Sequence, residues 1–502
     1  MNITSKLERK DFMKKGKKLL SFIMAVGLAV TCLAGCGGKS GGDKEITFCV
    51  IGEEPKDASV VMEKVNEKLD ERLGINLKLQ FVNTTNYDLL FSSGEDFDLV
   101  YIADWLQFWE NAEKGAFMEL TDEDLKEFAP DIYRDGQQYI NTAVYNGKRF
   151  AIPAIFEQSP DRCYLVRGDL MNKYGIDSIN SIDDFERYLD AIAKNEPDLI
   201  PYDENGANAF HTAVMMVNDQ GWLSPGTVSC ASPVFFNVDD PEKKLFIALE
   251  QEQMKEFTRR MKRWNDNGYF SKSALSNTIT SVDSFKNGRS AAAFSSGPQE
   301  VNTIYKEFQK DERKNWDIRA YPICQKMQPA YGQLNMGTAL SANTKNKEMA
   351  LKVMNELFAN EEIYDLMHYG IEGVHYNKLG EGLKEDLEID SFYEFGTGIA
   401  NQKYIRKNEL AFPNAQDVTA KLKSVYRYEP LVNMRKDLTN IREISAALDN
   451  IYNKYTAPRM LGFVDDPEKA MAEELDALKK AGIDTYIDDL QKQMDEYIKT
   501  LK

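Results

Sequence analysis

Residues Phe97–Ile102 have the sequence FDLVYI, a short apolar run of the kind that is buried in a parallel sheet. On the N-terminal side of this run, residues 75–82 (INLKLQFV) alternate between apolar and polar side chains as a strand does, and residues 45–51 (EITFCVI) predict a further strand. Between these two, residues 58–73 have apolar side chains at helical spacing, with Gly74 at the end. This alternation of strands and helices predicts an α/β layered domain.

Toward the C-terminus the same kind of alternation continues. Tyr145–Pro153 reads as a hairpin, since Asn146-Gly147 supplies the positive φ that a tight turn needs. Ser181 is a plausible helix N-cap, with two acidic residues after it in the first turn. Further strands are expected at residues 163–167, 290–294, 319–322 and 336–342, and helices at 121–139, 249–265, 281–287, 347–360 and 361–369. The tail 467–502 is expected to be an amphipathic helix pair that covers a core, interrupted at Ala481-Gly482; a coiled-coil partner is the alternative.

The first thirty-five residues have the pattern of a signal peptide. Seven Lys and Arg residues precede an apolar stretch, Leu19 to Ala34, which is short for a membrane span. The stretch ends in Leu33-Ala34-Gly35-Cys36, which matches the bacterial lipobox, in which the cysteine carries a lipid. A plain secretory signal with a coincidental cysteine is the alternative. Residues 36–44 are rich in Gly and Ser and predict a flexible tether.

Composition excludes several classes of protein. The chain has 502 residues, is 43% hydrophobic and has a mean hydropathy of −0.48, which excludes a disordered chain and a polytopic membrane protein. The formal net charge of −18 argues against a nucleic-acid partner. Cys49, Cys163, Cys230 and Cys324 are widely spaced, so buried free thiols are favoured over disulfides.

Sequence motifs of enzymes are missing. The chain contains no HExxH, GxSxG, Walker A or EF-hand pattern. Residues 396–401 resemble a dinucleotide fingerprint but lack its third glycine, and 203–206 favour an ordinary turn over a calcium loop. The three histidines, His211, His368 and His375, are expected to be structural or exposed. The sequence therefore predicts no catalytic residue, no metal site and no cofactor.

The order of several weak motifs resembles a known family. They are the hairpin Tyr145–Pro153, the strand and helix of Tyr164–Leu189, the run Ala291–Pro298, and Leu340–Asn346 followed by Ala350. The chain is similar to extracellular solute-binding proteins of ABC importers, in the large group that captures oligosaccharides. Near the C-terminus, Tyr369–Gly373, Ala481–Asp484 and Gln491–Gln493 resemble a subgroup of Gram-positive lipoproteins with an added helical C-terminal domain. Ile182 departs from the family, which often has an aromatic residue there.

This resemblance implies an α/β fold of two lobes joined by hinge crossover strands, with an extra C-terminal helical segment. Lobe I is expected at 45–154 plus 298–340, lobe II at 155–297 plus 341–430, and the extension, packed on the lobes, at 431–502. The implied function is capture of an oligosaccharide between the lobes and delivery to ABC permease subunits, with no covalent chemistry. The implied protein is a monomer on the extracellular face of the bacterial cytoplasmic membrane, anchored through Cys36, and it binds no nucleic acid.

Candidate ligand-binding residues follow from the chemistry of sugars, whose apolar faces stack on aromatic rings while their hydroxyls bind polar groups. Loops at the carboxyl ends of parallel strands point into the cleft of such folds. The candidates are Glu53, Glu54, Asp104, Trp105, Phe156, Glu157 and Ser296, with Trp222, Tyr331, Asn335, Tyr369 and Glu372 as weaker choices. For each aromatic the alternative is core packing, which is favoured for Trp109, and for Glu54 and Glu157 it is a solvated loop.

Two rival functions remain open from the sequence. A binding protein for another solute, such as a peptide or a modified amino acid, would have Arg and Asp clamps in place of stacked aromatic rings. A secreted carbohydrate-active enzyme would need a carboxylate pair, or a Tyr, Arg and His group, converging in one pocket. No motif supports the second rival.

Overall fold

The computed structural model describes residues 44–91, 96–145, 147–158, 160–387, 391–392 and 394–501. The expected signal peptide, the expected lipidation site Cys36 and the Gly-rich tether lie outside these residues, apart from Lys44. Within the described part of the chain, no helix is both long and apolar enough to cross a bilayer.

The first sheet has the strand order β2-β1-β3-β15-β6. Its strands are β1 (Lys44–Ile51), β2 (Ile75–Val82), β3 (Leu99–Ile102), β6 (Ile152–Pro153) and β15 (Gly337–Leu340). Every residue of β3 is buried, which confirms the interpretation of FDLVYI as a core strand. The pairing is mixed, because β3 runs parallel to β1 and antiparallel to β15.

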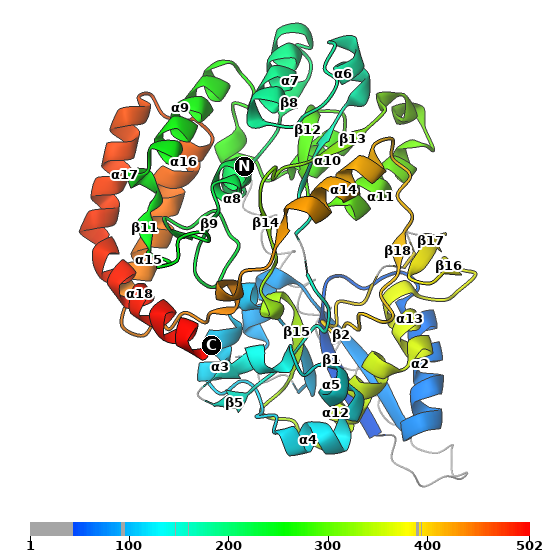
Figure 1. Cartoon of the computed structure of the whole chain (residues 1–502). Helices are drawn as coiled ribbons and strands as arrows, with labels where there is room; N and C mark the ends of the chain where they lie inside the picture. Colours follow the sequence, from blue (N-terminus) through cyan, green and yellow to red (C-terminus); the bar gives the residue numbers. More distant parts are fainter. Residues whose placement is uncertain are drawn as a thin grey trace, which may run out of the picture. The chain divides into compact units, whose positions relative to one another are not determined.

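Helices cover this sheet and complete lobe I (Figure 1). They are α2 (Ala58–Leu73), α3 (Phe108–Glu113), α4 (Asp122–Phe128), α5 (Pro130–Asp135), α12 (Lys347–Ala359) and α13 (Glu361–Tyr369). The helical stripe of α2 is fully buried at Val61, Val65 and Leu69, and Gly74 ends the helix in the left-handed conformation, at φ 64°. Strands β4 (Val144–Tyr145) and β5 (Lys148–Arg149) form the expected hairpin, whose Asn146 lies outside the described residues.

The second sheet has the order β13-β7-β12-β8 and forms the centre of lobe II (Figure 1). Its strands are β7 (Cys163–Val166), β8 (Ile200–Tyr202), β12 (Ser290–Ser295) and β13 (Arg319–Pro322). The surrounding helices are α6 (Gly168–Lys173), α7 (Ile182–Asn195), α8 (Val214–Asp219), α9 (Glu252–Asp266), α10 (Ser281–Lys286), α11 (Pro298–Phe308) and α14 (Ala415–Val425). Ser181 caps α7 as expected, since its side chain accepts from the Asp184 amide at 3.1 Å.

Short strands complete the architecture. A small sheet in lobe II joins β9 (Trp222–Leu223), β10 (Val234–Asn237) and β11 (Phe246–Ile247). The remaining pairings involve β14 (Gln328–Pro329) with β19 (Tyr426–Arg427), and β16 (Tyr376–Gly380) with β17 (Leu383–Asp386) and β18 (Lys407–Asn408).

Among the described residues, three segments connect the two lobes. The first runs from the end of β6 to the start of β7, and the second from the end of β13 to the start of β15. The third runs from Ile399, in the core of lobe I, to Phe412, in the core of lobe II. These crossings confirm the predicted hinge architecture.

The structure divides the chain between the lobes differently from the expected boundaries. Residues 298–322 were assigned to lobe I, but α11 and β13 belong to lobe II, because β13 pairs with β7 and α11 buries Val301 and Ile304 in the same core. The segment 341–399 was assigned to lobe II, but α12 and α13 pack on the first sheet. Consequently the chain does not cross between the lobes at Ser295–Gly297, because β12 continues directly into α11 within lobe II.

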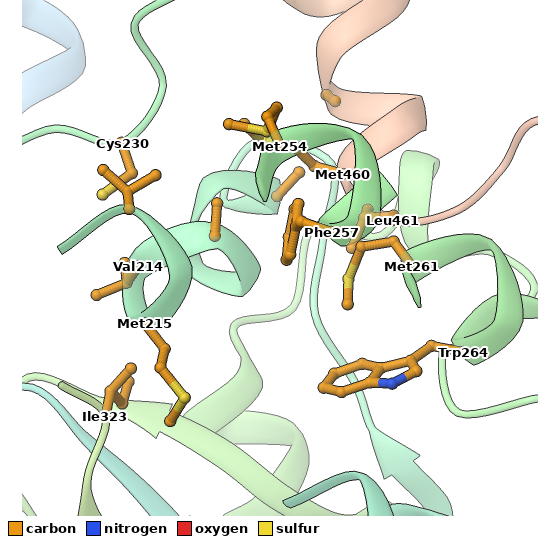
Figure 2. Close-up of a cluster of buried hydrophobic side chains, with 14 of the residues drawn as sticks. Val214, Met215, Cys230, Met254, Phe257, Met261, Trp264, Ile323, Met460 and Leu461 are labelled. Atoms are coloured by element: carbon orange, nitrogen blue, oxygen red, sulfur yellow. The ribbon is translucent and has the colours of Figure 1, made fainter. Parts of the chain in front are cut away.

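The C-terminal extension, defined here as residues 431–501, packs on lobe II. Its helices are α15 (Arg442–Ile451), α16 (Ala457–Met460), α17 (Pro467–Ala481) and α18 (Ile483–Thr500), with the π-helical turn Tyr452–Thr456 between α15 and α16. Figure 1 shows them in orange and red beside α9, and Figure 2 shows Met460 and Leu461 among Met254, Phe257 and Met261 of α9. The predicted tail pair with a break at Gly482 is therefore confirmed, and its apolar face joins the lobe II core.

Candidate functional site

A cavity of about 570 Å³ lies where lobe I, lobe II and the C-terminal extension meet. Lobe I contributes the turn after β3 and the start of α3, and lobe II contributes the loop between β9 and β10. The extension contributes the chain before α15, α15 itself and the turn after it. The polar and aromatic lining residues are Asp104, Trp105, Trp109, Glu110, Thr142, Thr227, Ser229, Ser232, Asn433, Lys436, Ser445, Asp449, Tyr452, Asn453 and Tyr486.

Trp105 presents an exposed ring that is held in place by its polar atoms. It follows β3 in a short 3-10 turn, Asp104–Leu106. Its indole Nε1 donates to the carbonyl of Asn335 at 2.9 Å, and its backbone N–H donates to Asp104 Oδ1 at 2.7 Å. The side chain nevertheless remains 54% exposed. A large, oriented and exposed indole is the platform that a sugar ring needs.

Trp109 belongs both to the core and to the cavity. Its ring packs edge-on against Phe108 at 4.8 Å, in agreement with the core packing that the sequence favours. The residue is only half-buried, however, and it also lines the cavity. The sequence cannot separate these two roles, because one face of an indole can pack while the other stays open.

Charged groups of both signs surround the cavity. Burial raises the pKa of the Asp104 carboxyl to about 6. Burial also lowers the pKa of the Lys436 ammonium, although Asp104, Asp449 and Glu110 act in the opposite direction. The pKa of Asp449 is likewise raised by burial, and Lys436 opposes this shift. The site thus holds partly desolvated donors and acceptors, which bind hydroxyl groups or charged groups more strongly than solvated ones do.

A second cavity, of about 510 Å³, adjoins the first. The two share Trp109, Glu110, Lys436 and Leu438 in their linings. The other residues of the second lining are Glu113, Lys114, Arg435, Thr439 and Arg442.

Arg435 links the extension to lobe I at this second cavity. Its guanidinium pairs with Glu113 of α3 and lies 3.6 Å from the ring centroid of Tyr145 and 5.3 Å from that of Trp109. The Tyr145 hydroxyl donates to Glu113 Oε1 at 3.2 Å. This cluster is a direct contact between the extension and lobe I, in addition to the hinge segments.

The structure places the predicted site residues in three groups. Asp104 and Trp105 line the first cavity, as expected. Tyr331 and Asn335 lie on the second crossing segment, where Asn335 orients Trp105 and also donates through Nδ2 to Gln158 Oε1 at 3.0 Å. Tyr331 and Asn335 do not line the cavity. Asn335 contributes indirectly, because its carbonyl holds the Trp105 ring in place.

The remaining predicted residues lie elsewhere and line neither cavity. Trp222 is a core residue, 4% exposed and packed between Phe235 and Phe246, because β9 faces inward. The Ser296 hydroxyl donates to the carboxylate of Glu300 in the first turn of α11. The carboxylate of Glu157 accepts from the Tyr426 hydroxyl.

Five further candidates are also outside both cavities. Glu53 and Glu54 are exposed after β1, and Phe156 is half-buried on the first crossing segment. The hydroxyl of Tyr369 is occupied within lobe I, since it donates to the Tyr404 carbonyl at 3.3 Å. Glu372 lines a separate surface groove beside α2 and α13.

The wall formed by the extension was not among the sequence candidates. Lys436, Asp449 and Tyr452 are its principal members. The helical periodicity of the tail marks apolar residues that pack inward, and it gives no sign that polar residues at the start of the tail face a cavity. The basic pair Arg435-Lys436 in an otherwise acidic tail was the one available signal.

Histidines and cysteines in the described residues serve structure. His211, His368 and His375 each pair with one carboxylate, at 3.0, 3.0 and 3.2 Å respectively. Cys49, Cys163, Cys230 and Cys324 are buried free thiols, as the sequence favours. In the same residues, no group of three or more His, Cys, Asp or Glu is arranged to hold a metal ion.

Comparison with known proteins gives two family matches. The model described as "Bacterial extracellular solute-binding protein" matches residues 52–363. The model described as "Domain of unknown function (DUF3502)" matches residues 431–499.

Two curated relatives match nearly end to end. A carbohydrate ABC transporter substrate-binding protein of Streptococcus pneumoniae is 24% identical, covering 98% of this chain and 100% of the relative. Lipoprotein LipO of Bacillus subtilis is 22% identical, covering 93% of this chain and 97% of the relative.

Solved structures share the fold at similar coverage. The N-glycan transport solute-binding protein NgtS of Streptococcus pneumoniae has a TM-score of 0.74 at 23% identity, covering 92% of this chain and 100% of that one. The alginate-binding protein AlgQ2 has a TM-score of 0.67 at 17% identity, covering 90% of this chain and 98% of that one. These similarities show the two-lobe fold with its C-terminal helical segment.

Proposed function

Since the chain belongs to the family of bacterial extracellular solute-binding proteins, we propose that it captures an oligosaccharide in the first cavity and delivers it to an ABC permease. The observation that carries the proposal is Trp105, an exposed indole fixed by Asn335 at the edge of a 570 Å³ cavity. The names of the relatives, a carbohydrate ABC transporter substrate-binding protein and an N-glycan transport protein, point to the same ligand class.

The lining suits the two kinds of surface that a sugar presents. Trp105 and Trp109 offer aromatic faces to the C–H groups of the rings. Around them, Asp104, Asp449 and Asn453 offer oxygen acceptors to the hydroxyls. The cavity volume lies in the usual range for small-molecule sites, which bury most of their ligand.

Closure of the lobes supplies the capture step. The cavity is lined by both lobes, and they are joined by crossing segments that act as hinges. A ligand that touches both walls has a higher affinity for the closed arrangement and shifts the population toward it. The closed form then presents both lobes to the permease.

The chemistry ends at binding, and we propose that the protein is not an enzyme and works as a monomer without cofactor or nucleic acid. The family is described as solute-binding, and one of the two curated relatives is named as a substrate-binding protein. We also propose a lipid anchor on Cys36 after removal of residues 1–35, on the extracellular face of the cytoplasmic membrane. The lipobox-like run and the lipoprotein relative support this placement. The anchor keeps the receptor close to the permease and raises its effective concentration there.

Thermal unfolding of residues 37–502 with a ligand panel tests the function. The panel contains neutral, amino and acidic oligosaccharides, peptides and amino acids. A true ligand at a hundredfold excess over its dissociation constant stabilises the native state by about 2.7 kcal/mol. A rise in the unfolding midpoint with one class of glycan supports the proposal. If only peptides or amino acids raise the midpoint, the ligand is not an oligosaccharide and the protein binds another solute. If the protein converts a glycan into a product, it is a carbohydrate-active enzyme.

A further inference from the structure

The second cavity has an unusual charge for this protein. Its lining contains four cations, Lys114, Arg435, Lys436 and Arg442, and two carboxylates, Glu110 and Glu113. The whole chain, in contrast, has a formal net charge of −18. The charge of this lining is therefore opposite in sign to the charge of the whole chain.

One of the four cations is paired by direct contact, while carboxylates act on Lys436 and Arg442 from a longer distance. Glu113 is already engaged by Arg435, so that pair contributes little net charge. Within the described part of the chain, Lys114, Lys436 and Arg442 form no ion pair at contact distance. The nearby Asp437 carboxylate accepts from the Thr439 amide at 2.9 Å and interacts with Arg442 only through the longer-range field.

Local structure adds to the attraction for anions. Arg442 is the first residue of α15, and Ile441 at the N-cap provides no side-chain acceptor for the free amides of the first turn. An arginine at this position opposes the helix dipole, so it is not there to stabilise the helix. The Nε of Arg435 is also buried without a hydrogen-bond partner. Of these groups, the side chains of Arg435 and Arg442 line the second cavity, and Glu443 adds one carboxylate to the first turn of α15.

The two cavities therefore differ in charge along one continuous site. The first has Asp104, Glu110 and Asp449 against Lys436, while the second has an excess of cations. Trp109 and Lys436 stand at the junction. A ligand long enough to occupy both would be oriented by this difference.

From this arrangement we infer that the second cavity is a subsite for an anionic substituent, a carboxylate or a sulfate ester, on the oligosaccharide held in the first cavity. The inference rests on the proposed function. The neutral rings occupy the aromatic first cavity, and Lys114, Lys436 and Arg442 receive the anion. Charge-assisted hydrogen bonds from these groups are about twice as strong as neutral ones.

Calorimetry with matched ligand pairs tests the inference. The probes are lactose, sialyllactose and sulfolactose, measured on residues 37–502. The expected result is that an anionic member binds about tenfold more tightly than lactose, and that added salt reduces the difference. The sialyl and sulfo arms distinguish a carboxylate from a sulfate ester as the anion.

A pair of double variants locates the effect. Lys114→Gln with Arg442→Gln removes two cations of the second cavity, and the preference for the anionic member is expected to disappear. Lys469→Gln with Lys480→Gln removes the same charge from exposed positions of α17 and keeps the preference. A preference that survives K114Q/R442Q overturns the inference.

The outcomes separate the inference from the function on which it rests. If lactose and its anionic forms bind with equal affinity, the second cavity is not an anion subsite, while the receptor function is retained. If none of these sugars binds and no glycan of the wider panel raises the unfolding midpoint, both proposals are overturned.

Discussion

At the scale of single residues, Trp105 combines a fixed position with an open face. Its Nε1 is held by the Asn335 carbonyl, so the ring is oriented before any ligand arrives. Trp105→Ala is expected to weaken the affinity for a neutral oligosaccharide about tenfold, since an aromatic contact contributes about 1 kcal/mol beyond its buried area. Trp105→Phe should retain part of the affinity. Isothermal titration calorimetry measures both.

Trp316 provides the matched control for this prediction. It is half-buried against Arg167, whose guanidinium lies 4.1 Å from its ring centroid, and it lines neither cavity. Trp316→Ala should lower the unfolding midpoint and leave affinity unchanged. An unchanged affinity in Trp105→Ala would remove the indole from the binding site.

Asp104 makes stability depend on pH in an unusual direction. Burial raises the pKa of its carboxyl to about 6 in the folded protein, from 3.8 in the absence of structure. The native state therefore binds more protons between these two values, and the stabilisation that the protonated group provides is lost as the pH rises through 6.

The variant Asp104→Asn isolates this effect. The unfolding midpoint of the wild type, relative to that of Asp104→Asn, should fall between about pH 4 and about pH 7. Differential scanning calorimetry across this range measures the difference. A difference that is independent of pH would mean that the carboxyl titrates normally in the folded protein.

Among the secondary-structure elements, a buried ion pair joins two helices of the extension, and its arginine also bonds to a helix of lobe II. Arg459 of α16 donates through Nε to Glu474 Oε2 of α17 at 2.6 Å, and both side chains are at most 3% exposed. Arg459 also donates to the Thr258 hydroxyl of α9 at 3.0 Å. The pair therefore ties three helices together within a desolvated region.

Removing one member of this pair leaves an uncompensated buried charge. Glu474→Gln is expected to destabilise the fold by about 3–5 kcal/mol. Chemical denaturation gives the change. The neighbouring exposed residue offers the control, because Glu473→Gln alters only a surface pair with Lys469 and should cost less than about 1 kcal/mol. Similar losses in the two variants would contradict a special role for the buried pair.

Elements with a strong local signal were predictable from the sequence. The buried run of β3, the apolar stripe of α2, the Ser181 cap of α7 and the break at Gly482 all depend on residues close together in the chain. The lobe to which each element belongs could not be predicted in this way. β13 belongs to lobe II because it pairs with β7, more than a hundred residues earlier in the chain, and α11 packs in the same core. The sequence of a short apolar strand does not indicate which of two sheets the strand will join.

The residues of the candidate site were also predictable only where the signal is local in the sequence. Asp104 and Trp105 could be found because they directly follow a buried strand, and such turns open toward clefts. Trp222 was misassigned because a lone indole has the same appearance in a core and in a cavity. Lys436 and Asp449 reach the site only through the packing of the extension on lobe II, which no local pattern specifies.

At the scale of the whole molecule, Arg435 holds the extension against lobe I. The contact combines the ion pair with Glu113 and the stacked ring of Tyr145. Arg435→Gln should reduce the population of the arrangement described here, and weaken the affinity for a neutral oligosaccharide by up to about tenfold, because more of the ligand's binding energy is then needed for closure.

Small-angle X-ray scattering of the ligand-free protein measures this change, and the radius of gyration should increase in Arg435→Gln. Arg427→Gln is the control, because it breaks an exposed pair with Asp239, at 2.7 Å, that does not involve lobe I. An identical radius and affinity in Arg435→Gln would mean that the hinge segments alone set the arrangement.

The position of β15 also has a consequence for how the protein is made. This strand, Gly337–Leu340, lies between β3 and β6, which end before residue 154. Synthesis proceeds at about 5–20 residues per second. The edges of β3 and β6 that pair with β15 therefore remain unpaired for many seconds after these two strands have been made. The first sheet cannot be completed on the ribosome until two thirds of the polypeptide exists. During that interval the unpaired edge of β3 can pair with a strand of another chain, as an exposed strand edge can in general.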